Sequence, residues 1–407
     1  NNIICLYKKI GYILCMKENN KLRKNDYLLL KTIFDNENIT ALELAEKMEV
    51  TPAMISKTIK KLKEQNYLIE DLPKKSVSRG RPRKVLAINS DYKKILGVNF
   101  GSDFIDVCVG NLNGDIIESR RKKFFLKTQE SLINLLVNEL DEYISKYKKD
   151  NIVGIGLALN GVFDVKNRMV KFSPYFKWKN FKIGNFLEDK YGIPIVTDND
   201  VRAMLNAERL MGNAKGKRNV FYLYLKNGIG GALIINNELY EGSNYQAGEF
   251  GHFIINKNSN FVCKCGKTGC IEAEFSEKSI KLMIMQEYEK STLTSFDDKY
   301  TIKQIYERAK VDPLFKKPVS IASYRIGEAV GNIMNVLDIG DVIVLGELIY
   351  SGDVFLENFK KGIHSSLTKE FGARVNVCTT GLGENAEKYG ALSLIMINLF
   401  SGLKLIK

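Results

Sequence analysis

Three cysteines and one histidine gather in a short stretch of this chain and restrict its local fold more than any other feature. Cys263, Cys265 and Cys270 fall within eight residues, and His252 precedes them in a chain that has only two histidines. These four side chains form a suitable ligand set for a tetrahedral zinc ion, and glycines between the ligands allow tight turns. We therefore predict one structural Zn²⁺ without an open coordination position. Three buried thiols beside a packed histidine are the alternative.

The remaining cysteines give no disulfide pattern. The chain has seven cysteines, and those outside the cluster are scattered singly. An odd number at this spacing is a poor disulfide framework, so we expect a reducing, cytoplasmic location. No apolar run reaches membrane-spanning length. The stretch from Ile3 to Met16 is interrupted by lysines and lacks a signal-peptide cleavage site, so we expect a short helix that packs on a partner.

Positive charge is concentrated near the beginning of the chain. The 407 residues suffice for two or three domains and carry a formal net charge of +14. Residues 1–90 hold 18 Lys and Arg against 10 Asp and Glu, a net charge of +8, whereas the other 317 residues carry only +6. This asymmetry indicates a nucleic-acid-binding module in residues 1–90. A general lysine bias would explain the excess but not its distribution.

Local signals in residues 26–64 predict three helices. The first is expected over Asp26–Asn36 and the second over Ala41–Met48, where Thr40 supplies an N-cap and a capping box. Thr51 caps the third helix, and Pro52 takes its first position, where a missing N–H is harmless. Two helices joined by a short turn, the second of them basic, are typical of a helix-turn-helix.

The exposed face of the third helix is predicted to contact DNA. Its apolar residues recur at helical spacing and should face the core, which leaves polar and basic residues on another face. A three-helix bundle with a solvated lysine face is the alternative, and the charge asymmetry favours DNA. The predicted contacts on this helix are Ser56, Lys57, Lys60 and Lys63.

A basic loop follows between two short predicted strands, Tyr67–Glu70 and Val85–Ile88. Arg79, Arg81 and Arg83 alternate with Gly and Pro in this loop and resemble the core of an AT-hook. Arginines on a slim, extended backbone suit the narrow minor groove of A·T-rich DNA. Alone, such a run is often a flexible linker. After a helix-turn-helix, it predicts the wing of a winged helix.

From Lys94 onward, buried strands that run into glycine alternate with long helices. This alternation of strands and helices predicts an α/β region with two similar halves. An amphipathic helix is expected over Thr128–Lys148. The predicted strands are Ile95–Gly101, Ile105–Val109, Ile152–Ala158, Val220–Leu225, Gly231–Ile235 and Asp341–Leu345.

From about Ile95 to its end the chain resembles the ROK family (repressor, open reading frame, kinase). The cysteine cluster with its upstream Gly-His is similar to the family's zinc signature. The winged helix matches the branch of xylose-repressor-like and N-acetylglucosamine-repressor-like proteins. The resemblance implies an actin-like fold with two ribonuclease-H-type lobes. The expected domains are a winged helix over residues 1–90, a first lobe over 91–202 with a packed-back helix over about 385–407, and a second lobe over 203–384.

The resemblance also implies a sugar pocket. Glu249, His252 and Glu272 match the family's sugar contacts, since carboxylates accept hydrogen bonds from vicinal hydroxyls. Asn199 and Asp200 match the family's Asn-Asp pair, in which the kinases use the Asp as general base. Asp200 is thus a vestigial catalytic candidate. From the residues alone, an Asn-Asp pair between a strand and a helix is equally a helix cap.

The nucleotide motifs depart from those of the family's kinases. Asn99 replaces an Asp, and Asp103 places a carboxylate where a Thr is expected and would repel a triphosphate. Residues 226–231 replace a Gly-Thr-Gly-x-Gly-Gly loop, and Glu347 replaces a Gly near the adenine. Three changes directed at one ligand predict that the chain is not an enzyme, although residual kinase activity stays open.

Together these features predict a sugar-responsive transcriptional repressor of carbohydrate-use genes that binds double-stranded operator DNA and a small sugar. Helix-turn-helix proteins usually read two half-sites, so we expect a homodimer, with a tetramer left open. The alternatives are an active ATP-dependent sugar kinase with a DNA-binding domain, and a zinc protein whose basic end is only an interaction arm. The sequence leaves open the sugar's identity, among glucose, xylose and N-acetylated hexosamines, and its role as inducer or corepressor.

Overall fold

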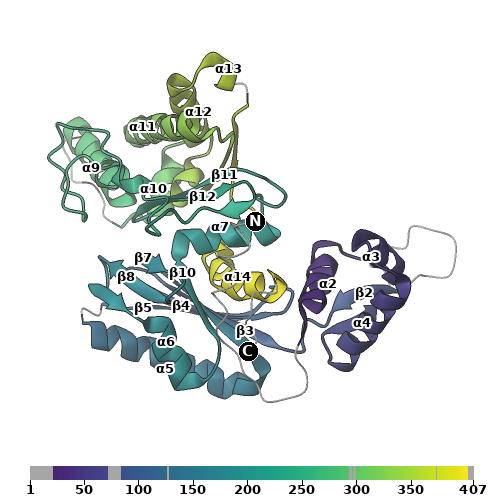
Figure 1. Ribbon diagram of the computed structural model, residues 1–407. Coiled ribbons are helices and arrows are strands. Elements are labelled where there is room, and N and C mark those ends of the chain that lie inside the picture. Colours follow the sequence, from purple (N-terminus) through teal and green to yellow (C-terminus); the bar gives the residue numbers. More distant parts are fainter. Residues whose placement is uncertain are drawn as a thin grey trace. The chain divides into compact units, whose positions relative to one another are not determined.

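The computed structural model of the protein describes residues 22–71, 84–125, 128–292, 296, 299–372 and 374–401. The chain divides into two compact units (Figure 1). Unit 1 comprises Asn1–Met204 and Glu387–Lys407, and unit 2 comprises Leu205–Ala386. In the part of the chain described here, no helix is both long enough and apolar enough to cross a membrane.

Unit 1 begins with the predicted winged helix-turn-helix. Its helices are α2 (Lys24–Asp35), α3 (Ala41–Lys47) and α4 (Pro52–Glu64), followed by the antiparallel pair β1 (Leu68–Asp71) and β2 (Val85–Ile88). Buried Leu29, Leu44, Ile55 and Leu62 join the helices in a small core. The predicted bounds hold to within two residues because capping signals act locally.

The sheet of unit 1 has the strand order β10-β6-β3-β4-β5. The strands β3 and β6 and the strands β6 and β10 are parallel, whereas β3-β4-β5 is an antiparallel meander. The strands are β3 (Lys94–Phe100), β4 (Phe104–Asn111), β5 (Ile116–Lys123), β6 (Ile152–Leu159) and β10 (Ile195–Asn199).

Helices cover both faces of this sheet (Figure 1). Leucines of α5 (Gln129–Tyr147) and α6 (Ile183–Tyr191) pack against Leu96, Val98 and other residues of one face. On the other face, α7 (Asp200–Met211) and α14 (Ala386–Ser401) pack with Ala158 of β6. A Cβ on Gly156 would collide with the Ala391 carbonyl of α14, so this glycine allows the helix to approach the sheet closely.

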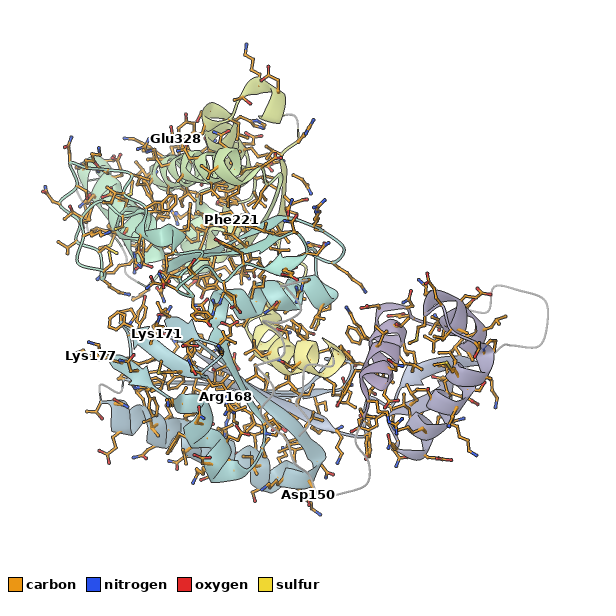
Figure 2. All side chains as sticks on the ribbon, in the orientation of Figure 1. Asp150, Arg168, Lys171, Lys177, Phe221 and Glu328 are labelled. Atoms are coloured by element: carbon orange, nitrogen blue, oxygen red, sulfur yellow. The ribbon has the colours of Figure 1, made fainter. Side chains whose placement is uncertain are left out.

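A small antiparallel sheet extends unit 1 in the order β7-β8-β9 and was not predicted from the sequence. Its strands are β7 (Val162–Asp164), β8 (Met169–Ser173) and β9 (Trp178–Phe181). Trp178 is fully buried and stacks with Phe100 of β3 at a ring-centroid distance of 6.2 Å. The side chains of Lys171 and Lys177 belong to this region (Figure 2). Strands this short carry too little alternation to be recognised in a sequence.

Unit 2 repeats the same arrangement in the strand order β13-β12-β11-β14-β15. Its strands are β11 (Val220–Leu225), β12 (Ile229–Ile235), β13 (Glu238–Leu239), β14 (Asp341–Gly346) and β15 (Asn376–Thr379). The strands β11, β14 and β15 are parallel neighbours, whereas β11-β12-β13 is an antiparallel meander. The prediction of two similar α/β halves is thereby confirmed.

Long helices enclose the core of unit 2. Phe221 of β11 lies in this core (Figure 2), together with Phe315 and Ile326 of the longest helix and Phe359 of the next one. The helices are α8 (Ile271–Phe275), α9 (Glu277–Thr292), α10 (Ile302–Arg308), α11 (Pro313–Leu337), α12 (Asp353–Ser366) and α13 (Lys369–Gly372). Short 3-10 helices cover Phe250–His252 and Glu347–Ser351.

Candidate functional site

Unit 2 brings the four predicted metal ligands together. The ligand atoms of His252, Cys263, Cys265 and Cys270 all lie within 4.8 Å of one another. The Cys263 sulfur is 3.5 Å from Nδ1 of His252, and the sulfurs of Cys265 and Cys270 are 3.7 Å apart. Bonds of about 2.3 Å to sulfur and about 2.0 Å to nitrogen place tetrahedral ligand atoms roughly 3.5–3.8 Å apart. The residues present therefore fit a tetrahedral metal ion.

The backbone of residues 252–270 folds the loop so that these ligands converge. Isolated β-bridges join Ile254 to Cys270 and Val262 to Thr268. The Cys263 N–H donates to the Lys267 carbonyl at 2.7 Å, which closes a tight turn between the ligands. Gly266 adopts φ +88° inside this turn, a conformation that side chains disfavour. The ligand spacing in the sequence is thus matched by local turn geometry.

The electrostatics of the cluster favour a bound cation. Cys263 and Cys270 are buried, and burial raises the pKa of the Cys270 thiol to about 12. Without a positive charge these sulfurs would stay protonated at neutral pH, whereas a divalent ion stabilises thiolates. Nε2 of His252 lies 3.5 Å from the Glu249 carboxylate, so the ring has its Nδ1 toward the sulfurs and its other nitrogen toward an acid. Carboxylates commonly orient metal-bound histidines in this way.

The predicted sugar contacts of unit 2 surround this loop. Glu249 is exposed and immediately precedes the 3-10 helix Phe250–His252. Glu272 lies in the first turn of α8, where its carboxylate accepts the Ile229 N–H at 3.0 Å. The loop that holds the metal ligands therefore also positions Glu249, and Glu272 is tied to the start of β12. The predicted metal ligands and the predicted sugar contacts of unit 2 are therefore structurally linked.

Asn199 and Asp200 lie in unit 1, at the junction of β10 and α7. The Asn199 side-chain oxygen accepts the N–H groups of Val201 and Arg202, and its amide donates to the Gly161 carbonyl at 3.1 Å. Asn199 thus caps the helix, as the residues alone allowed. Asp200 is 8% exposed, and its carboxylate accepts the Val201 N–H at 2.9 Å.

The positions at which the sequence predicts altered nucleotide motifs lie at or beside turns of both units. In unit 1, Asn99 is buried at the end of β3, and Asp103 is exposed in the tight turn before β4. The Gly101 N–H donates to the Phe104 carbonyl at 2.9 Å and closes this turn. In unit 2, residues 226–228 form the turn between β11 and β12, and Glu347 follows β14. Each replacement occupies a strand end, where phosphate-binding turns are typically found.

The winged helix presents most of the predicted DNA contacts of α4 to solvent. The Thr40 and Thr51 hydroxyls each accept an N–H from the third residue of the helix that follows. Ile55, Ile59 and Leu62 face inward, whereas Ser56, Lys57 and Lys60 are exposed. The helix therefore has one apolar face and one exposed face that is rich in lysine.

Lys63 has a structural partner that the sequence did not reveal. Its Nζ lies 2.7 Å from the Glu70 carboxylate of β1, which also contacts Lys84 at 3.0 Å. Hydrogen bonds from these two lysines lower the pKa of Glu70. Lys63 thus joins α4 to the base of the wing. The wing residues Arg79, Arg81 and Arg83 and the predicted helix within residues 3–16 lie outside the described residues.

Two buried charge clusters in unit 1 were also missed. Arg202 of α7 contacts the buried Asp198 carboxylate, with Nε at 2.8 Å. Arg121 of β5 contacts Asp106 of β4 at 2.7 Å and Glu387 of α14 at 2.5 Å. The second cluster joins residues 266 positions apart, so no local pattern could reveal it. The first has an i, i+4 spacing that could have been recognised across the strand–helix junction.

Comparison with known proteins agrees with this architecture. Residues 95–397 match the ROK family model, and residues 22–70 match the MarR family model. A xylose repressor from Caldicellulosiruptor bescii is 27% identical over 388 residues, which cover 93% of this chain and 96% of that protein.

Solved structures share the fold as well. A ROK family transcriptional regulator, described as a homologue of the E. coli MLC protein, has a TM-score of 0.81 and 21% identity over 93% of this chain and 97% of that one. A ROK family glucokinase from Streptomyces griseus, solved with glucose and AMPPNP, has a TM-score of 0.66 and 24% identity over 74% of this chain and 98% of that one. With a family match that extends from β3 into α14 and includes the cysteine loop, the chain belongs to the ROK family.

Proposed function

We propose that this protein is a sugar-responsive transcriptional repressor of carbohydrate-use genes. The observation that carries the proposal is the similarity to a xylose repressor along 93% of the chain, winged helix included. The exposed lysine face of α4 and the sugar motifs of the ROK region support the same function. We place the DNA-binding domain in residues 1–90, the first lobe in 91–202 with the C-terminal helix, and the second lobe in 203–384. The proposed place of action is the cytoplasm.

The proposed metal is a structural Zn²⁺ held by His252, Cys263, Cys265 and Cys270. Four protein ligand atoms within 4.8 Å of one another support a closed site, in which no position remains for an activated water. A bound zinc ion would hold the loop in shape and thereby fix Glu249 beside the sugar. Metal analysis of the purified protein should find about one zinc per chain.

We propose that the sugar is bound by Asn199, Asp200, Glu249, His252 and Glu272. The carboxylates would accept hydrogen bonds from ring hydroxyls. His252 would act chiefly through the metal and through Glu249, because both of its ring nitrogens already face other groups. Xylose, glucose and N-acetylated hexosamines are the candidate effectors. Thermal-shift measurements with a panel of these sugars should identify one that raises the melting temperature.

The proposed DNA contacts are Ser56, Lys57, Lys60 and Lys63 on α4 and Arg79, Arg81 and Arg83 in the wing. Lys57→Ala should alter sequence preference, because it lies near the start of the recognition helix, whereas Arg81→Ala should weaken binding through the minor groove. We propose a homodimer that reads two half-sites, with further pairing into a tetramer left to measurement. Salt-titrated gel shifts and light scattering test these points; DNA retention that does not depend on salt would contradict the electrostatic contacts.

The second candidate function is sugar phosphorylation, which the match to a glucokinase over 74% of the chain favours. Asp103 and Glu347 place carboxylates where family kinases have uncharged residues, so we propose that the protein does not use ATP. A coupled ATP assay with the same sugar panel distinguishes the two functions. If the protein phosphorylates a sugar with ATP and Asp200→Asn abolishes this activity, the protein is a bifunctional enzyme and not only a repressor.

A further inference from the structure

The first turn of α4 exposes apolar side chains beside the basic residues of the same helix. Pro52, Ala53 and Met54 are all exposed, and 53% of Met54 is accessible to solvent. Ile55, Ile59 and Leu62 already fill the inward face of the helix. Met54 is therefore not part of the core of the winged helix. A single exposed methionine would need no explanation, but this one adjoins exposed Ala53 in the leading turn of a recognition helix.

The threonine hydroxyls near this turn bond to the backbone of the helix. The Met54 N–H donates to the Thr51 hydroxyl at 3.3 Å, and the Thr58 hydroxyl donates to the Met54 carbonyl at 3.1 Å. Both hydroxyls are thereby held against the backbone of the helix. The outward surface of residues 52–54 is thus made of methyl, methylene and thioether groups. Exposed Ser56 and Lys57 begin the polar surface directly after it.

Charge around the turn favours a nucleic acid over a protein as the partner of this surface. Lys57 and Lys60 follow Ala53 on the exposed face of α4 and would attract phosphates. Met54 also borders a hollow of about 440 Å³ whose lining includes Glu46 and Glu49. These acids would keep a phosphate backbone away from the α3 side of the hollow. We therefore expect the lysines to contact the phosphate backbone of the DNA and the apolar turn to contact the bases.

The thymine methyl group is the one apolar group that base pairs display in the major groove. A purine or cytosine edge placed against Met54 would lose water from its polar atoms and gain no hydrogen bond, which is unfavourable. A thymine methyl would bury apolar surface instead. Resting on the proposed repressor function, we propose that Ala53 and Met54 recognise thymine methyl groups in the operator and make it selective for A·T pairs at these positions.

The test separates the methyl group from every other feature of the DNA. The full-length protein first selects its operator from a random pool of double-stranded oligonucleotides. Each thymine of a half-site is then replaced by deoxyuridine, which removes only the C5 methyl. The unaltered protein should lose about threefold to tenfold in affinity at one or two positions, the scale of one buried methyl-sized group.

Variants then assign the methyl contact to a residue. Met54→Gln keeps the length of the side chain but makes it polar, so it should bind the thymine and deoxyuridine operators equally at the position that Met54 contacts. Met54→Leu should keep the preference, and Ala53→Gly should lose it at a different position. Leu28→Ala is the matched control, since Leu28 is 50% exposed but lies on α2. Thermal melting verifies that each variant is folded.

Each outcome has a distinct meaning. An operator without thymine at the contacted positions would overturn the inference, as would a thymine preference that survives in both Met54→Gln and Ala53→Gly. If Met54→Gln leaves DNA binding unchanged but abolishes binding of a basic peptide, the hollow is a protein-docking surface and the inference is wrong. If the unaltered protein selects no DNA sequence at all, the proposed repressor function fails as well.

Discussion

The sheets of units 1 and 2 share one topology and differ in how their antiparallel edge ends. In each unit three parallel strands adjoin an antiparallel meander. In unit 1 the meander ends in β5, which runs eight residues, from Ile116 to Lys123. In unit 2 it ends in β13, only two residues long, from which the chain enters the region of the metal-ligand loop.

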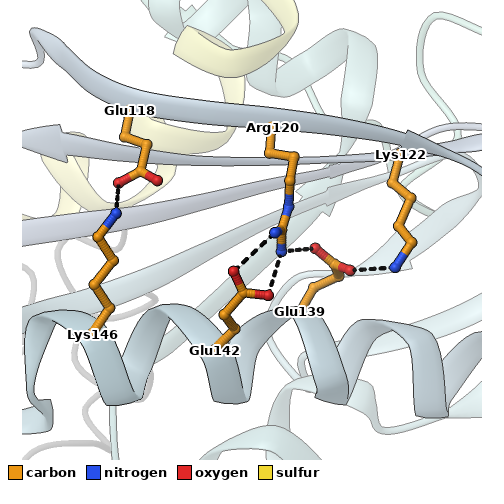
Figure 3. A network of polar contacts seen from close by, with 6 residues as sticks. All are labelled: Glu118, Arg120, Lys122, Glu139, Glu142 and Lys146. Carbon is orange, nitrogen blue, oxygen red and sulfur yellow. Dashed lines mark hydrogen bonds and ion pairs between the residues drawn. The ribbon is translucent and has the colours of Figure 1, made fainter.

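Charged side chains fasten the edge strand of unit 1 to a helix. Arg120 of β5 contacts Glu139 at 2.6 Å and Glu142 at 2.7 Å, both on α5 (Figure 3). Lys122 contacts Glu139 at 3.1 Å, and Glu118 contacts Lys146 at 2.6 Å. An edge strand that carries charges and is covered by a helix is protected from pairing with another chain.

Unit 2 uses the corresponding region for a different purpose. The loop after β13 carries the candidate metal ligands and the carboxylate of Glu249. An ion-pair network is a sum of weak contacts that can be lost one at a time, whereas a metal cluster fails when one ligand is lost. The comparison teaches that the same sheet topology supports both arrangements, and that the shortened edge strand leads toward the loop of the candidate metal ligands.

The largest expected effect is the loss of one metal ligand. Cys265→Ser should abolish metal binding and with it sugar binding, because the loop also carries Glu249. Metal content and sugar-dependent thermal shift measure both losses. Cys378→Ser is the matched control, since Cys378 is half-buried on β15 and outside the cluster. If the metal-free Cys265→Ser protein still binds sugar fully, sugar binding does not depend on the metal, and the contrast drawn between the two sheet edges is wrong.

The next largest expected effect is the contribution of unit 1 to sugar binding. Asp200→Asn should weaken sugar binding by about 1–3 kcal/mol, roughly fivefold to 150-fold, because a charged hydrogen-bond acceptor is lost. If the sugar is an inducer, the variant should also stay on its operator when sugar is added. Calorimetry and gel shifts measure these effects. Asp189→Asn, on the exposed surface of α6, is the control; equal losses in both variants would deny Asp200 a specific role.

A smaller effect is expected from the ion-pair network of Figure 3. Arg120→Ala should lower the free energy of unfolding by about 1–2 kcal/mol, because the nearly buried Glu139 carboxylate loses one of its partners. Lys146→Ala removes an exposed pair and should cost about 0.5 kcal/mol or less. Denaturant unfolding compares the two variants. If the two variants lose the same free energy of unfolding, the burial of Glu139 does not strengthen its ion pairs beyond those of exposed residues.

The smallest effect is a pH dependence at Glu118. Hydrogen bonds from Lys146 and Tyr147 lower the pKa of Glu118 below its ordinary value of 4.5. A lowered folded-state pKa gives stability that is present above pH 4.5 and is lost as the pH falls through the folded-state pKa. The difference in unfolding free energy between the unaltered protein and Glu118→Gln should be about 0.5 kcal/mol or less at pH 7 and shrink toward pH 3. A difference that grows on acidification would contradict this sign.

The sequence predicted the features that depend on neighbouring residues. Thr40 and Thr51 mark helix starts because their hydroxyls cap N–H groups three residues ahead. Strand β11 was predicted with its observed bounds, Val220–Leu225, because a short apolar run that is rich in aromatic residues favours a buried strand. The four candidate metal ligands were recognisable because three of them lie within eight residues and their spacing reflects local turns.

The tertiary structure decided what distant residues do to one another. Lys63 has the same local pattern as Lys60 but contacts Glu70 of β1, which no periodicity reveals. Arg121, Asp106 and Glu387 meet only because α14 returns to the sheet of unit 1. Exposed Met54 could be recognised only once Ile55, Ile59 and Leu62 were seen to fill the core. Capping and turn formation are local and can be read along a chain, whereas ion pairing and exposure depend on which distant segments the fold brings together.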